Sequence, residues 1–266
     1  MIITDSFVVL NYPRTGSTFV RQALAELYRR KGSRWSRASR WLRRKPALRD
    51  LQLPILRTDT AARASRYSQH GAYSQIPAAD RHKTVVSVAR HPLDRVVSIY
   101  EAGFWRSHPP ADPDAIRAAL PGFPDLSFTE FLTLQRRFDR PNVLRGAPLQ
   151  ADVGAQTIHF LRFYHPRPDE ALRSLTSDRL DDGSLLAELP SIRWLRLERL
   201  TADLAALLRD NGFDARETER LEQRERVNVA AARKQRQWHS YFGAEEEARY
   251  RQEERFVFDA LGYTEP

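Results

Sequence analysis

Two segments in the first hundred residues follow the same plan: an apolar strand ends in an anion-binding turn and then enters a helix. The first covers residues 7–20 and reads FVVLNYPRTGSTFV. The second covers residues 85–98 and reads VVSVARHPLDRVVS. A strand, a tight turn and a helix repeated in this order favour an α/β fold, in which helices pack on a parallel sheet.

The turn of the first segment contains several groups that bind anions. Arg14 supplies a charged guanidinium, and Thr15, Ser17 and Thr18 supply hydroxyl groups. Gly16 allows the backbone to approach a ligand closely, and the N–H groups and dipole of the following helix favour an anion at the same place. The pattern is not a Walker A loop, because it has one glycine and no lysine follows it. We therefore expect a phosphate-binding turn that differs from that of ordinary NTP kinases.

The turn of the second segment predicts a second phosphate position. Arg90 stands at the end of the expected strand over residues 84–89, and Ser98 lies eight residues further on, in the next helix. An arginine binds phosphate through two hydrogen bonds, and a serine hydroxyl adds another. The two turns together indicate a ligand with two phosphate groups, such as a doubly phosphorylated nucleotide.

Apolar runs and helical spacing predict the remaining elements. We expect strands over residues 2–11, 55–57, 67–73, 84–89 and 192–197, and helices over residues 19–30, 93–105, 128–138, 200–210 and 244–261. The chain has 266 residues, of which 41% are hydrophobic, and this suits one α/β domain. We predict a single three-layer domain over residues 1–266, with a central, mostly parallel sheet flanked by helices.

Two segments stand apart from this pattern. A basic arm covers residues 32–50, in which Trp35 and Trp41 lie among arginines. It fits either a solvated arm or a surface for an anionic acceptor or lipid headgroups, and the second reading implies peripheral membrane contact. Prolines gather over residues 105–127, where we expect a lid or an acceptor loop.

Composition narrows the classes of function. The net charge of +9 attracts anions such as nucleotides, nucleic acid, acidic glycans or membrane surfaces. The chain contains no cysteine, so disulfides, thiolate metal sites and cysteine nucleophiles are excluded. No apolar run approaches the roughly 18–20 residues that span a bilayer, and the N-terminus shows no signal pattern. We expect a soluble cytoplasmic protein.

At this point the residues resemble the PAPS-dependent sulfotransferases, which use 3′-phosphoadenylyl sulfate (PAPS). Residues 12–19, YPRTGSTF, look like the 5′-phosphosulfate loop of that family, and Arg90 with Ser98 looks like its 3′-phosphate site. Further similarity covers RLE at 196–198, RVN at 226–228, WHSYF at 238–242 and residues 258–263. The resemblance implies a P-loop NTPase-like sulfotransferase fold. It also implies transfer of a sulfuryl group to a hydroxyl or amine of a carbohydrate, lipid or small-molecule acceptor.

The resemblance assigns roles around the nucleotide. Arg14 stands where the family usually has lysine, and would contact the transferred group and the bridging oxygen. The remaining donor contacts would come from Thr15, Gly16, Ser17 and Thr18 at the 5′-phosphate, Phe19 near the adenine, Arg90 and Ser98 at the 3′-phosphate, and Asn228, Arg233 and Lys234 in a loop folded over the nucleotide. We expect no metal, because the acidic residues show no ligand spacing.

His70 is the predicted catalytic base. It precedes Arg90 at a spacing similar to that of the base histidine in cytosolic members of the family, and an imidazole titrates near neutrality. Ser68 replaces a lysine that the family often has at this place. A polar residue at a strand end is the alternative interpretation of His70, and Glu101 is an alternative base. The other candidates, His91, His108 and His159, fall in the nucleotide turn, the lid and an apolar helical stretch.

Two other functions remain open on the sequence. A P-loop-like small-molecule kinase would also bind phosphate at a strand–helix turn, although the loop lysine is missing. A basic nucleic-acid-binding protein would explain the charge, although no recognisable RNA or DNA motif is present. Our prediction is therefore a nucleotide donor and a hydroxyl- or amine-bearing acceptor as partners, and no nucleic acid.

Overall fold

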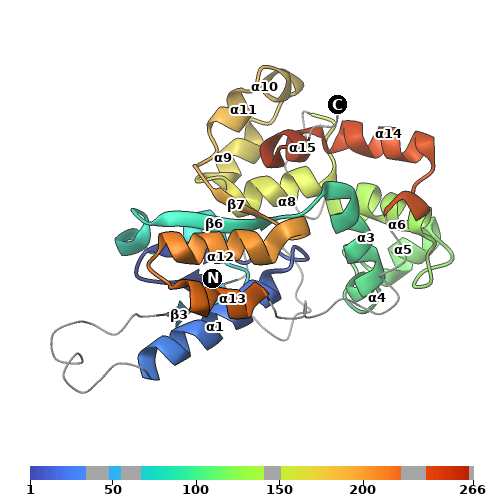
Figure 1. The fold of residues 1–266 in the computed structure, drawn as a ribbon. Coiled ribbons are helices and arrows are strands. Elements are labelled where there is room, and N and C mark those ends of the chain that lie inside the picture. Colours follow the sequence, from blue (N-terminus) through green and yellow to red (C-terminus); the bar gives the residue numbers. More distant parts are fainter. Residues whose placement is uncertain (34–47, 55–66, 141–150, 223–237, 264–266) are drawn as a thin grey trace. The chain divides into compact units, whose positions relative to one another are not determined.

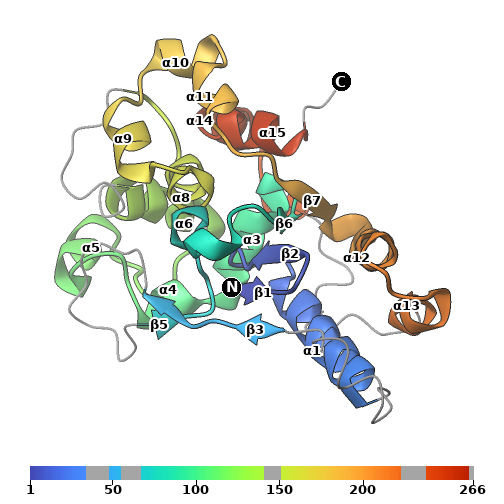
Figure 2. The same cartoon turned by 90° about the vertical axis from the view of Figure 1, so that its left-hand side faces the viewer.

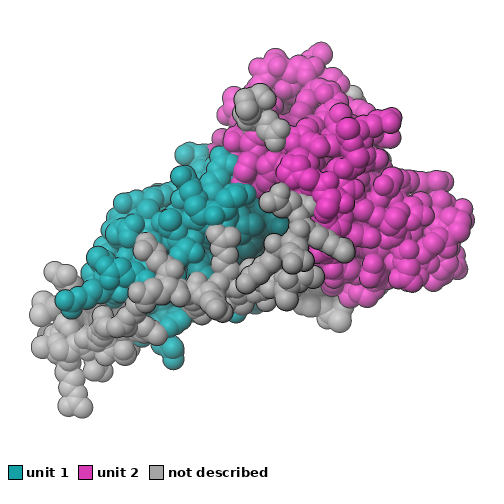
Figure 3. All heavy atoms as spheres, turned by 45° about the vertical axis from the view of Figure 1, so that its right-hand side comes forward, with its two compact units in different colours: residues 1–55, 67–90, 191–231 teal, residues 56–66, 91–190, 232–266 magenta. Residues whose placement is uncertain are grey.

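The computed structural model describes residues 1–33, 48–54, 67–140, 151–222 and 238–263 (Figure 1). The contacts divide the chain into two compact units, which Figure 3 shows in different colours. Unit 1 comprises residues 1–55, 67–90 and 191–231, and unit 2 comprises residues 56–66, 91–190 and 232–266. Each unit has its own hydrophobic core.

Unit 1 contains the strands and the helices that pack on them. Its elements are β1 (Ile2–Ile3), β2 (Phe7–Leu10), α1 (Ser17–Ser33), β3 (Arg49–Asp50), β4 (Leu53–Pro54), β5 (Tyr67–Ser68), η1 (Tyr73–Gln75), η2 (Ala78–Asp80), β6 (Thr84–Ala89), β7 (Arg193–Arg196), η4 (Leu197–Arg199), α12 (Leu200–Asp210) and α13 (Ala215–Glu222). The α/β class that the sequence predicts is confirmed.

A five-stranded sheet with the order β3-β1-β2-β6-β7 forms the centre of unit 1. Strands β2, β6 and β7 are parallel, whereas β1 is antiparallel to both β2 and β3. The predicted mostly parallel sheet is therefore mixed. The cause lies in the expected strand over residues 2–11, where Thr4 donates its N–H to Phe7 O at 2.9 Å and its Oγ1 accepts from Phe7 N at 2.9 Å. These bonds reverse the chain and make a hairpin of β1 and β2.

The core of unit 1 lies between one face of this sheet and its helices. Alternate residues of β2 and β6 face it, as the period of a strand requires. Figure 2 shows α1, α12 and α13 together with these strands. The cluster includes Phe7, Val9, Val86, Val88, Leu195, Phe19, Val20, Leu24, Leu204 and Leu208. A second, two-stranded sheet pairs β4 with β5 and sets the position of the residues that follow Ser68.

Unit 2 is helical in its described part. Its elements are α3 (Pro92–Ala102), α4 (Phe104–Ser107), α5 (Pro113–Ala119), α6 (Phe128–Leu134), the π-helix η3 (Gln135–Asp139), α8 (Ala155–Tyr164), α9 (Pro168–Arg173), α10 (Ser177–Asp181), α11 (Ser184–Ala187), η6 (Trp238–Ser240), α14 (Ala244–Glu253) and α15 (Arg255–Leu261). No helix in the described ranges is long and apolar enough to cross a bilayer.

Several predicted boundaries change for local reasons. The expected helix over residues 93–105 ends at Gly103, whose left-handed backbone separates α3 from α4. The expected lid over residues 105–127 contains helix α5, because the side chain of Asp112 caps it and Pro113 starts it. The expected strand over residues 55–57 and residues 34–47 of the basic arm lie outside the described residues.

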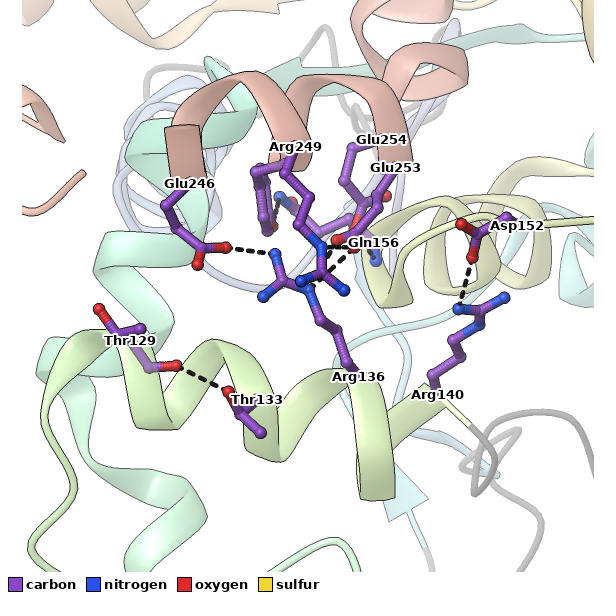
Figure 4. A network of polar contacts seen from close by, with 11 residues as sticks. Thr129, Thr133, Arg136, Arg140, Asp152, Gln156, Glu246, Arg249, Glu253 and Glu254 are labelled. Atoms are coloured by element: carbon purple, nitrogen blue, oxygen red, sulfur yellow. Dashed lines mark hydrogen bonds and ion pairs between the residues drawn. The ribbon is translucent and has the colours of Figure 1, made fainter. Parts of the chain in front are cut away.

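The buried carboxylate of Glu254 holds the last two helices of unit 2 against α8. It lies between α14 and α15 and caps α8 by accepting hydrogen bonds from Gln156 N at 2.8 Å, Thr157 N at 2.7 Å and Thr157 Oγ1 at 2.8 Å. A Cβ on Gly154 would lie 2.0 Å from Glu254 Oε1, so the cap requires a glycine there. The neighbouring Glu253 joins a second network, in which Arg136 Nε contacts both its oxygens at 2.9 Å (Figure 4).

Burial raises the pKa of Glu254 from 4.5 to about 7. Between these values the folded protein holds a proton that the unfolded chain has lost, so the contribution of this residue to stability falls as the pH rises from 4.5 to 7. Glu254→Gln removes this titration. We expect the wild type to lose on the order of 3 kcal/mol of unfolding free energy relative to Glu254→Gln as the pH rises from 4.5 to 7.

Chemical denaturation of both proteins across the pH range measures this difference. Glu245→Gln, a change of an exposed acid in the same unit, is the control and should run parallel to the wild type. Parallel curves for wild type and Glu254→Gln would show that the cap stays ionised throughout.

Candidate functional site

The loop between β2 and α1 has a strained backbone. Arg14 has φ 68° and Gly16 has φ 91°, both in the left-handed region. Glycine enters this region freely, whereas arginine does so only where its surroundings impose it. The hydroxyl of Thr15, which is 1% exposed, donates to Tyr12 O at 2.8 Å and closes the loop on itself. Strain of this kind gathers where a loop is shaped for a ligand.

Gly16 is required for space as well as for conformation. A Cβ at this position would lie 2.7 Å from Leu197 Cδ1 and 3.3 Å from Leu200 Cδ2. Its carbonyl accepts from Phe19 N at 3.0 Å, which starts the first turn of α1. The loop therefore rests directly on the segment where η4 meets α12.

The beginning of α1 offers donors to an anion. The helix has 17 residues and no acidic residue in its first turn. Ser17 is buried and Thr18 is exposed. The first N–H groups of a helix have no partner within it, and the helix dipole adds partial positive charge. The predicted phosphate contacts of residues 15–18 thus lie on one loop and one helix terminus.

Arg90 joins this loop through a hydrogen bond. Its NH1 group donates to Arg14 O at 2.9 Å. The contact arises because β2 and β6 are parallel neighbours, with Leu10 beside Ser87, so that both strands end at the same edge of the sheet. Ser87 Oγ strengthens the pairing by donating to Leu10 O at 2.8 Å. We predicted that Arg14 and Arg90 bind two different phosphate groups, and the structure brings the guanidinium of Arg90 to the main-chain carbonyl of Arg14.

His70 also contacts the residue where this loop begins. It follows β5, and its Nδ1 lies 2.6 Å from Asn11 O. A carbonyl only accepts hydrogen bonds, so the proton of a neutral imidazole is on Nδ1 and Nε2 is unprotonated. The main-chain N–H of His70 donates to Ser68 Oγ at 3.1 Å. The predicted base thus lies at the start of the predicted phosphate loop.

Asn11 is a site residue that sequence reasoning missed. It follows β2 directly and is 1% exposed. Its Nδ2 donates to Gln69 O at 3.4 Å. Within the described residues its buried Oδ1 accepts no hydrogen bond. The sequence feature that could have identified Asn11 is its polar side chain directly after the apolar run FVVL.

The other predicted donor residues belong to different parts of the chain. Phe19 is 4% exposed and packs in the core of unit 1, so its ring is a core residue here and the expected contact with adenine has no support. Ser98 is buried in α3 of unit 2, whereas Arg90 is the last residue of this part of unit 1. Three predicted residues, Asn228, Arg233 and Lys234, lie outside the described residues.

The alternative bases belong to unit 2, whereas His70 belongs to unit 1. Glu101 accepts a hydrogen bond from the hydroxyl of Tyr241. The ring of His108 stacks on Phe104 with 4.1 Å between centroids. The other two candidate histidines also have neighbours in unit 2. His159 Nε2 lies 4.0 Å from Asp139 Oδ1, and the ring of His91 packs against Trp238, Phe258 and Tyr263.

Comparisons with family models, with curated proteins and with solved structures give no match to this chain. Among the described residues, no group of three or more His, Asp or Glu side chains is placed to hold a metal ion. The functional interpretation therefore depends on the residues of the loop and their geometry.

Gly16→Ala should lower the unfolding free energy by about 2–4 kcal/mol, because it adds both left-handed strain and crowding against Leu197. Gly212→Ala is the matched control. Gly212 also lies in unit 1 with φ 79°, but a Cβ there would meet nothing within 4 Å. It should cost only the strain, about 1–2 kcal/mol. Chemical denaturation compares the two, and equal losses would mean that the loop can move away from Leu197.

Proposed function

We propose that this protein is a sulfotransferase that moves a sulfuryl group from PAPS to a hydroxyl or amine of a carbohydrate, lipid or small-molecule acceptor. One observation carries the proposal. The strained loop after β2 joins Arg14, Arg90 and the imidazole of His70, whose Nδ1 lies against Asn11 O and leaves Nε2 as the basic nitrogen of the neutral ring. Phosphate-binding groups beside a general base are what transfer from a nucleotide donor to a nucleophile requires.

The proposed reaction is a direct, in-line displacement at sulfur. Nε2 of His70 takes the proton of the acceptor hydroxyl or amine, whose oxygen or nitrogen forms the new bond to sulfur. The bond between sulfur and the bridging oxygen breaks, and adenosine 3′,5′-bisphosphate leaves with the electron pair. Arg14 and the N-terminus of α1 stabilise the negative charge that develops on the leaving phosphate. The protein thus supplies orientation and preorganised charge.

In this proposal Arg90 contributes to nucleotide binding in two ways. Its guanidinium supplies positive charge beside the loop, and its hydrogen bond to Arg14 O stabilises the left-handed conformation of that residue. Loss of Arg90 therefore removes a phosphate ligand and relaxes the loop that binds the other phosphate. The effect falls on binding of the nucleotide, whereas loss of Arg14 falls on the chemical step.

Calorimetry with adenosine 3′,5′-bisphosphate tests the nucleotide site. We expect Arg90→Ala to weaken binding by about tenfold or more, because a charge-assisted contact contributes roughly 1.5–3 kcal/mol. Arg29→Ala, which removes an exposed arginine more than two turns into α1, is the matched control and should bind like the wild type. Unchanged affinity in Arg90→Ala would argue strongly against the assignment.

The chemical step is tested with a radiolabelled sulfuryl donor and pools of acceptors. Arg14→Ala should reduce turnover by on the order of 100- to 1000-fold, with a smaller effect on nucleotide affinity. Two outcomes would favour other functions. Tighter binding of ATP than of adenosine 3′,5′-bisphosphate would indicate a kinase. Salt-sensitive binding of oligonucleotides that no nucleotide competes with would indicate a nucleic-acid-binding protein.

A further inference from the structure

Asn11 and Ser68 hold the segment that contains His70 at two points. Asn11 accepts from the ring of His70 through its carbonyl and donates from its side chain to Gln69 O. Ser68 Oγ accepts from the main-chain N–H of His70. The ring of His70 is thus held at the residue where the phosphate loop begins, and its main-chain N–H is held by Ser68.

We infer that Asn11 and Ser68 are positioning residues. Their side chains hold residues 69 and 70 so that the ring of His70 stays on the main-chain carbonyl of Asn11, with its proton on Nδ1 and Nε2 as the proton acceptor. The inference rests on the proposed function only for what Nε2 does. The tautomer of the neutral ring itself follows from the contact, since the 2.6 Å separation between Nδ1 and Asn11 O requires a hydrogen bond and Asn11 O cannot donate one. A base whose ring is already oriented loses less entropy when the reaction occurs.

The side chain of Asn11 supports this interpretation because packing alone does not explain it. The position is 1% exposed and follows four buried apolar residues of β2. An apolar side chain would fill such a place without cost. The amide instead leaves Oδ1 without a hydrogen bond from the described residues, and a buried group of that kind costs about 1–3 kcal/mol. A buried polar group left unmatched calls for an explanation, and the bond from Nδ2 to the His70 segment gives one.

Asn11→Leu separates a positioning role from a structural one. The substitution removes the unmatched oxygen and keeps a side chain of similar size. Gln69 O keeps its hydrogen bond from the amino group of Met1. We therefore expect the thermal stability to stay unchanged or to rise, while the segment loses the hydrogen bond that holds Gln69 to the side chain of residue 11 and the ring of His70 leaves the carbonyl of residue 11 more often. A structural role would instead lower the stability.

The first readout is the imidazole nitrogen spectrum of the full-length protein labelled with ¹⁵N-histidine. In the wild type above the titration range of His70, we expect one tautomer with the proton on Nδ1. In Asn11→Leu and in Ser68→Ala we expect a mixture of both tautomers. Asn211→Leu, which changes a half-buried asparagine at the end of α12 in the same unit, should leave the His70 signals unchanged.

The second readout is the division of the effect between kcat and KM. We expect Asn11→Leu and Ser68→Ala to lower kcat by about 10- to 100-fold, the size of effect that a misplaced catalytic group produces. Affinity for adenosine 3′,5′-bisphosphate should stay within about twofold, because the phosphate ligands are retained. Ser68→Thr keeps the hydroxyl acceptor and should restore both the tautomer and kcat.

Two results would overturn the inference. One is a wild-type His70 with its proton on Nε2. The other is an Asn11→Leu protein in which the tautomer and kcat are those of the wild type. If Asn11→Leu does not fold, Ser68→Ala decides by the same measurements. Absence of sulfuryl transfer in the wild type would overturn the proposed function, and the tautomer spectra would still decide the positioning.

Discussion

The candidate site depends on the parallel pairing of β2 with β6. Because both strands end at the same edge of the sheet, the loop after Leu10 and the residue after Ala89 lie within hydrogen-bond distance. Arg90 and Arg14 meet across 76 residues of chain for this reason. The pairing is stabilised by apolar residues that are buried along both strands. A rigid sheet edge of this kind can impose a backbone conformation on a loop.

The loop uses that rigidity to hold conformations that cost free energy. Arg14 lies in the left-handed region, and Asn11 buries an unmatched oxygen. Each of these two features costs on the order of 1–3 kcal/mol, and well-packed surroundings can offset such amounts. Two such costs lie within four residues, beside a glycine that has no room for a side chain. They fit a loop that is shaped for a ligand.

Elements with strong local signals could be predicted from the sequence. The bounds of β6 and α12 agree with the expected ranges, because a continuous apolar run and a helical spacing with a clear stop define them. Predictions were wrong where one hydrogen bond decides the structure. Thr4 turns the expected first strand into a hairpin, and Asp112 caps a helix inside an expected loop. Single side-chain bonds of this kind leave no periodic pattern.

The sequence by itself determined the chemistry of the loop, because Arg14, Gly16 and the following hydroxyl residues are contiguous and their anion-binding groups need no distant partner. Only the tertiary structure decided which ring nitrogen of a neutral His70 carries the proton. That proton is set by the carbonyl of Asn11, which is 59 residues away along the chain. Main-chain carbonyls are alike in every residue, so a sequence cannot record which of them a distant side chain will meet. The contacts of residues 69 and 70 with Asn11 set it in the folded chain.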